Sequence, residues 1–126
     1  MNIAEYFEVA GPRGYYRPIG ETSLHEAVRW VLAAIRHARE IGLSELIIDA
    51  RGVTGFEAPG VFDRYDLIKQ WFAAAAGQVR LAVVVRPEMI DEQRFGVMVA
   101  ANRGNATDVF TTEEAAAAWL DERRSS

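Results

Sequence analysis

Two uninterrupted apolar runs constrain the fold of this chain more than any other feature: ELIID at 45–49 and VRLAVVV at 79–85. Both are rich in branched residues, and neither alternates between polar and apolar positions as a strand with one solvated face does. Such runs are typical of parallel strands that helices cover on both faces. Between them, segment 61–76 has apolar residues at helical spacing, so we predict the crossover helix of a βαβ unit and an α/β fold.

A hairpin is predicted before these central strands. Segments 3–9 and 15–19 read as strands, and GPRG at 11–14 supplies turn residues. The first strand alternates as an exposed edge strand does, and Pro18 places the second strand at an edge or at a strand end. The free edge of the first strand could also pair with a second copy, so a homodimer is one expectation.

Helices fill most of the remaining chain. Ser23 and Glu26 form a capping box for a helix that ends near Gly42, and Thr111 and Glu114 form a second box for a helix over 111–124. A third helix is expected over 90–104, followed by a short strand at 106–110. The predicted order is therefore β-β-α-β-α-β-α-β-α, a mixed five-stranded sheet covered by helices, in a single domain over residues 1–126.

Composition excludes several classes of function. The chain has no cysteine, so disulfides and thiolate zinc sites are excluded, and a net charge of -4 gives no general attraction to nucleic acid. The two histidines, His25 and His37, stand too far apart on one helix to share a metal, so we expect no metal and no cofactor. No signal peptide or membrane-spanning run is visible, which predicts a cytoplasmic protein that does not span a membrane.

No catalytic set can be recognised in the sequence. The serines do not lie on a strand-to-helix elbow, and Ser23 is explained as a helix cap. Acidic pairs such as Asp63 with Asp66 fall at helix starts, where carboxylates favour the helix dipole. Since no nucleophile, base and orienting group can be placed together, we expect that the protein is not an enzyme.

The segment IDARGVTGFEAPG at 48–60 resembles the STAS family of anti-sigma-factor antagonists and anion-transporter tails, and the whole chain is similar to the SpoIIAA-like (STAS/SEC14-like) bacterial group. Matches to the antagonist pattern are Asp49, Gly52, Val53, Thr54 and Gly60. Segments 63–65 (DRY), 84–88 (VVRPE) and 95–104 (FGVMVAANRG) are similar to the SpoIIAA-like group.

The chain departs from the antagonist pattern where the phosphorylatable serine would stand. That position holds Ala58, within EAPG at 57–60, so no hydroxyl is available there. A phosphate would add nearly two negative charges at a partner interface, and this chain cannot use that switch. Thr54 is the nearest hydroxyl, and a turn or capping role is the simpler interpretation of it.

A binding site is predicted at the carboxyl ends of the parallel strands, where ligands and partners meet open α/β sheets. Three segments should emerge there: 49–60, 86–92 and 110–112. Aromatic and arginine side chains together are typical of binding hot spots; the alternative is that Phe56 and Phe62 fold inward and the charges only solvate loops. The candidate binding residues are Asp49, Arg51, Thr54, Phe56, Glu57, Phe62, Arg86 and Glu88.

Two functions follow from these observations. The first is a non-enzymatic regulatory or protein-interaction module, whose protein partner binds through the strand-end loops. The second, implied by the SEC14-like resemblance, is a binder of a small apolar or amphipathic, lipid-like ligand. Alanines in 69–77 and 113–120 could leave room beneath Trp71 or Trp119, or could simply let helices pack closely on the sheet.

Overall fold

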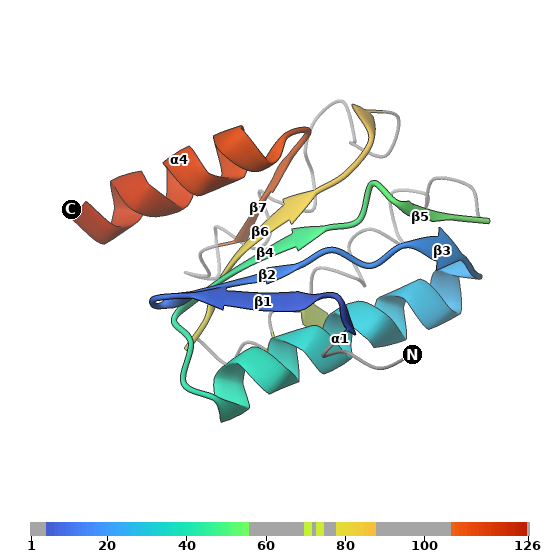
Figure 1. Ribbon diagram of the computed structural model, residues 1–126, viewed down its shortest axis with the longest axis horizontal. Coiled ribbons are helices and arrows are strands. Elements are labelled where there is room, and N and C mark those ends of the chain that lie inside the picture. Colours follow the sequence, from blue (N-terminus) through green and yellow to red (C-terminus); the bar gives the residue numbers. More distant parts are fainter. Residues whose placement is uncertain (1–4, 56–69, 72, 75–77, 88–106, 126) are drawn as a thin grey trace.

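The computed structural model describes residues 5–55, 70–71, 73–74, 78–87 and 107–125. Its main sheet has five strands in the order β1-β2-β4-β6-β7 (Figure 1). The strands are β1 (Phe7–Ala10), β2 (Arg13–Tyr16), β4 (Glu45–Asp49), β6 (Arg80–Val84) and β7 (Thr107–Phe110). β1 pairs with β2 in antiparallel fashion and every other pair is parallel. The α/β class and the mixed five-stranded sheet are therefore confirmed.

The hairpin forms as predicted, but its turn is shorter. Gly11 and Pro12 connect the two strands, and Gly11 has φ +61, a conformation that favours glycine. Arg13 and Gly14, which the sequence placed in the turn, belong to β2. A side chain at Gly14 would meet Leu43 at 2.8 Å and Phe7 at 2.9 Å, so only glycine lets this strand pack closely. β1 lies at the edge of the sheet, whereas β2 is internal, and Pro18 follows the end of β2.

One face of the sheet is covered by α1 (Leu24–Glu40). Ser23 caps this helix, since its Oγ accepts a hydrogen bond from the Glu26 amide at 3.2 Å. The Glu26 carboxylate pairs with Arg29 at 3.1 Å on the surface of the helix. The helix buries Val31, Ala34, Ile35 and Ala38 against a cluster that includes Tyr16, Leu46, Ile48, Trp71, Ala74, Leu81 and Val83.

The opposite face is covered by α4 (Glu113–Ser125). Ala116 and Leu120 pack there against Ile47, Ala82 and Val84, and the rings of Phe110 and Trp119 are 5.6 Å apart. The predicted capping residue is wrong by one position. Thr112 caps the helix by accepting a hydrogen bond from the Ala115 amide at 3.2 Å, and the preceding Thr111 contributes its carbonyl elsewhere.

Ion pairs hold α4 to strand β2 near both ends of the helix. Arg13 binds Asp121 and also Glu45, the latter at 3.0 Å, and Arg17 binds Glu113 at 2.9 Å. The spacing matches, since four residues of a strand and eight residues of a helix both span about 12–13 Å. Burial alone would lower the pKa of Arg13, but hydrogen bonds to Tyr15, Asp121 and Glu45 raise it above its ordinary value.

A second, two-stranded sheet was not predicted. β3 (Gly20–Glu21) and β5 (Val53–Thr54) pair in parallel. β3 follows β2 after three residues, and β5 follows β4 after three residues. Since β2 and β4 are parallel neighbours in the main sheet, the small sheet continues the same pairing beyond their ends. The strands lie side by side beyond the ends of β2 and β4 in Figure 1.

The helices predicted over 61–76 and 90–104 lie largely outside the described residues. Of the first, residues 70–71 and 73–74 are described and helical, with Trp71 and Ala74 in the core beneath α1. Within the described ranges, no helix combines the length and the apolar character that crossing a membrane requires.

Candidate functional site

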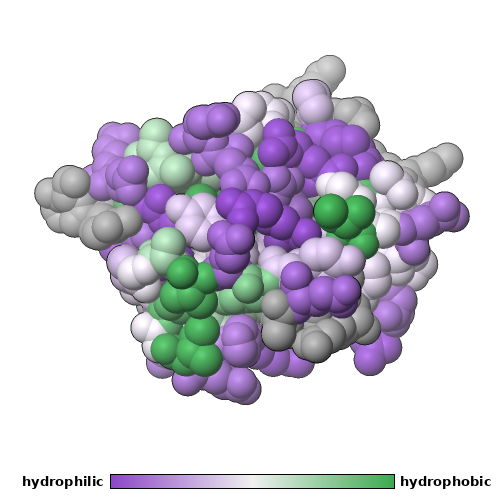
Figure 2. Space-filling view, in the orientation of Figure 1, coloured by the Kyte–Doolittle hydropathy of each residue, from purple (hydrophilic) through white to green (hydrophobic). Residues whose placement is uncertain are grey.

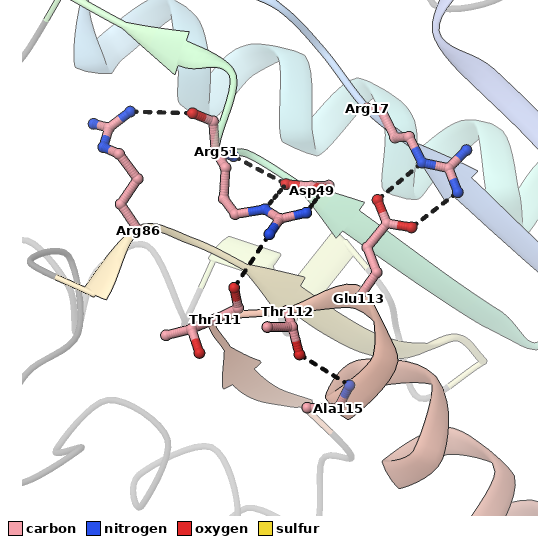
Figure 3. A network of polar contacts seen from close by, with 8 residues as sticks. All are labelled: Arg17, Asp49, Arg51, Arg86, Thr111, Thr112, Glu113 and Ala115. Carbon is pink, nitrogen blue, oxygen red and sulfur yellow. Dashed lines mark hydrogen bonds and ion pairs between the residues drawn. The ribbon is translucent and has the colours of Figure 1, made fainter.

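The candidate site begins with Asp49, the last residue of β4. Its side chain is 11 % exposed and binds Arg51, two residues further along the chain. The Arg51 Nε donates to Oδ1 at 2.9 Å and Nη2 donates to Oδ2 at 2.7 Å, while the Arg51 amide also donates to Oδ1 at 3.1 Å. This two-pronged pair fixes the direction in which Arg51 leaves the strand (Figure 3).

The charge on Asp49 is stabilised by these contacts. Burial alone would raise the pKa of the Asp49 carboxyl, but the hydrogen bonds from the Arg51 side chain and from the Arg51 amide lower it below its ordinary value. Asp49 in turn raises the pKa of Arg51. Both groups are therefore charged at neutral pH, and Asp49 serves as an anchor for the arginine.

Arg86 fixes the segment that follows Arg51. It stands two residues after β6, and its Nη1 donates to the Val53 carbonyl at 2.8 Å and to the Arg51 carbonyl at 3.3 Å. On its other side β5 pairs with β3, where the Thr22 amide donates to the Thr54 carbonyl at 2.7 Å. The guanidinium thus takes the place that a neighbouring strand would occupy beside β5.

A second arginine–carboxylate pair lies beside the first. Arg17 follows β2, and its Nε and Nη2 donate to the two oxygens of Glu113 at 2.9 Å each. These bonds raise the pKa of Arg17, which also lies 4.8 Å from the ring centre of Tyr15. Arg51 connects this region to the end of β7, since its Nη1 donates to the Thr111 carbonyl at 3.4 Å. Figure 3 shows both pairs at the start of α4.

We call the surface made by Ile19, Arg17, Arg51, Thr54 and Arg86 the carboxyl-edge surface. Ile19 is 63 % exposed, the highest value among the exposed large hydrophobic residues of the described part of the chain. Thr54 is exposed beside it on β5. Figure 2 shows an apolar spot enclosed by hydrophilic side chains near the position of β3. An exposed apolar residue on a surface that also carries arginines is a composition found in protein interfaces.

The structure brings together part of the predicted site. Asp49, Arg51 and Arg86 meet as expected, and the predicted approach of segment 110–112 is confirmed by the bond from Arg51 to the Thr111 carbonyl. Thr54 lies on the same edge. The other candidate residues, Phe56, Glu57, Ala58, Phe62 and Glu88, lie outside the described residues.

Three residues of the site were not predicted: Arg17, Ile19 and Glu113. The sequence predicted Arg17 within a strand over 15–19, which Pro18 placed at an edge or at a strand end, so the carboxyl end of this strand was not expected beside that of β4. Glu113 was interpreted only as part of a helix start. The one available signal was the alternation along β2 and the residue after it. Arg13, Tyr15 and Arg17 share one face, and two arginines on one face predict carboxylates on the helix that covers that face.

Other chemistry was also sought in the structure. In the described ranges, no three histidine, aspartate or glutamate side chains gather where they could hold a metal ion. Trp71, suggested as part of a ligand site, is 9 % exposed, and its buried Nε1–H has no acceptor in the described part of the chain. Trp119 is half-buried and packs on Phe110.

Comparison with protein-family models, with curated proteins and with solved structures gives no match to this chain. The resemblance to the STAS family therefore stays a prediction from the sequence motifs.

Proposed function

We propose that this chain is a non-enzymatic protein-interaction module, similar in fold to STAS domains, which binds a protein partner through the carboxyl-edge surface. The observation that carries the proposal is the fixed geometry of the arginines, together with exposed Ile19, which lies close to Gly52, the residue after Arg51. Arg17 and Arg51 each bind a carboxylate through two nitrogens, and Arg86 binds two carbonyls.

This rigidity favours binding because a partner would not have to immobilise these side chains. Ordering one long side chain at an interface costs about 0.5–1.5 kcal/mol, and here much of that cost is met during folding. Arg17 and Arg51 are still about two-fifths exposed, at 41 % and 42 %, so their guanidinium faces can be reached from outside. Arginine and large apolar side chains are the residues that dominate many interfaces.

The resemblance adds one feature of regulation. STAS antagonists are switched by a phosphate on serine, and this chain has Ala58 at the corresponding position. The proposed module would therefore bind constitutively or respond to another signal. A phosphorylated serine at position 58 is excluded by the sequence itself.

Affinity capture from the native cell tests the proposal. Ile19→Lys and Arg86→Ala alter the carboxyl-edge surface, and Ile41→Lys and Arg29→Ala are matched controls, since Ile41 is 48 % exposed and Arg29 is a paired surface arginine on α1. A partner retained by both controls and lost from both surface variants supports the module. A partner retained by all four variants, or no partner at all, contradicts it.

One observation favours a second function, binding of an amphipathic ligand. The buried Trp71 Nε1–H has no acceptor among the residues that the structure describes, and a ligand oxygen that accepted from it would recover about 1–3 kcal/mol. Native mass spectrometry followed by organic extraction tests this function. A mass above that of the chain, with an extractable lipid or metabolite that is reduced in Trp71→Phe, supports it; a ligand-free chain contradicts it.

A further inference from the structure

Strand β1 forms one edge of the five-stranded sheet and pairs only with β2 in the described part of the chain. Residues 8–10 are exposed, and Val9 is 53 % exposed. At the nearby end of α1, Ile41 is 48 % exposed, and Figure 2 shows a larger apolar area where β1 and the end of α1 meet. An exposed edge with apolar side chains is a template for pairing with another strand.

The register of the hairpin determines which backbone groups point outward from this edge. The Arg17 amide donates to the Tyr6 carbonyl at 3.0 Å, so Tyr6 and Arg17 form a hydrogen-bonded pair. Such pairs alternate along an antiparallel ladder, and Glu8 opposite Tyr15 is therefore the next one. The backbone N–H and C=O groups of Phe7 and Val9 point away from β2.

We propose that two copies of this chain associate by antiparallel pairing of their β1 strands, with Glu8 opposite Glu8 of the second copy. In this register Phe7 of each copy lies opposite Val9 of the other, and the outward groups of these residues form four hydrogen bonds. Aromatic residues opposite branched residues are favourable cross-strand pairs. The two sheets become one continuous sheet of ten strands.

The neighbouring register is worse for the backbone. Centring the pair on Val9 would place Phe7 opposite Gly11, but Gly11 has φ +61 and forms the turn, so it cannot continue an extended ladder. The register centred on Glu8 uses only residues that already lie in β1 or directly precede it. This register brings the two Glu8 carboxylates close together. Arg17 reduces their repulsion, because in each copy its Nη1 lies 3.5 Å from the Glu8 carboxylate.

The association is weak by size. Two strands of four residues bury much less than the roughly 1,200 Å² of the smallest stable interfaces, so we expect a weak dimer with a dissociation constant on the order of 0.1–1 mM. Because the pairing opposes like charges, salt should strengthen it, and neutralising Glu8 should strengthen it further. Most substitutions at an interface weaken a dimer, so a tighter dimer after neutralisation of Glu8 would be a distinctive result.

Sedimentation equilibrium across about 0.05–1 mM protein tests the proposal. Glu8→Gln should tighten the dimer about threefold and Val9→Lys should weaken it about tenfold, whereas Ile19→Lys, an equal change at an exposed residue far from β1, should have no effect. A wild-type chain that stays monomeric at every concentration and salt would overturn the proposal, as would a dimer that Val9→Lys leaves intact.

Cysteine cross-linking tests the register, because the chain has no cysteine of its own. In the proposed pairing the two Cα atoms at position 8 lie about 4.5 Å apart, within reach of a disulfide, and those at position 9 are about 8 Å apart, beyond it. Oxidation should link Glu8→Cys and leave Val9→Cys unlinked. Linking of Val9→Cys alone, or of neither variant, would overturn the register.

Discussion

Replacing Glu45 with glutamine should destabilise the sheet although the shape of the side chain is kept. Glu45 is 1 % exposed at the start of β4, and it accepts a hydrogen bond from Arg13 at 3.0 Å. The Arg13 side chain is itself 8 % exposed. Glu45→Gln preserves the shape of the side chain and removes its charge, so the guanidinium is left in a buried place with less compensation.

The size of the effect follows from the contacts that remain. Removing one partner of a buried ion pair costs about 3–5 kcal/mol when the other charge is left uncompensated. Arg13 keeps Asp121, whose side chain is 62 % exposed, and a bond with Tyr15, so we expect a smaller loss of about 2–3 kcal/mol in the free energy of unfolding. For a chain of this length that lowers the melting temperature by roughly 6–12 °C.

Urea denaturation followed by circular dichroism measures this loss, and two other variants identify its cause. Asp121→Asn should cost about 1 kcal/mol or less, because its pair with Arg13 is largely screened by water. The double variant Arg13→Met with Glu45→Leu should recover most of the loss, since apolar residues can replace a buried pair. This account of the pair is wrong if Glu45→Gln costs less than about 1 kcal/mol, or if the double variant is less stable than Glu45→Gln.

Three further predictions concern pH and backbone strain. Asp49→Asn should cost about 2 kcal/mol at pH 7. Because the pKa of Asp49 is lowered on folding, wild-type stability should fall as the pH drops below about 4, and the variant should lose less stability over that range in urea denaturation. Burial raises the pKa of Tyr16 to about 12, so wild-type stability should decline between about pH 10 and 12, and a decline equally present in Tyr16→Phe would contradict this cause. Gly55→Ala should cost about 2–3 kcal/mol in urea denaturation, and Gly42→Ala about 1 kcal/mol. Both glycines have positive φ, but only a Cβ at position 55 would lie 2.7 Å from the Thr22 carbonyl, so equal losses would contradict the clash.

The central part of the fold was predictable because its signals are local. The continuous apolar runs at 45–49 and 79–85 identified buried parallel strands, and the structure pairs them directly. Ser23 identified a helix start because a capping hydroxyl acts on an amide three residues away. The cap at Thr112 was missed because Thr111 and Thr112 carry the same hydroxyl, and the sequence does not show at which of them the helix begins.

The sequence predicted only those residues of the candidate site that follow strands it had located. Asp49, Arg51 and Arg86 follow strands that the sequence identified, so their meeting at one edge could be expected. Arg17 was missed because a hairpin pattern does not say which strand of the pair joins the rest of the sheet. The sheet formed by β3 and β5 was missed because two-residue strands have no periodicity to recognise.

The ion pairs between β2 and α4 also bear on the order in which the chain can reach its native state. Arg13 and Asp121 are 108 positions apart, and Arg17 and Glu113 are 96 apart, so these contacts close nearly the longest loops that this sequence contains. Folding rates fall as contacts become more distant in sequence. During synthesis β2 leaves the ribosome long before α4 exists, so Arg13 cannot bind Asp121, and Arg17 cannot bind Glu113, until much later. The hairpin should therefore be open to water and to other chains until α4 docks, and completion of the sheet face should be the late, slow event of folding.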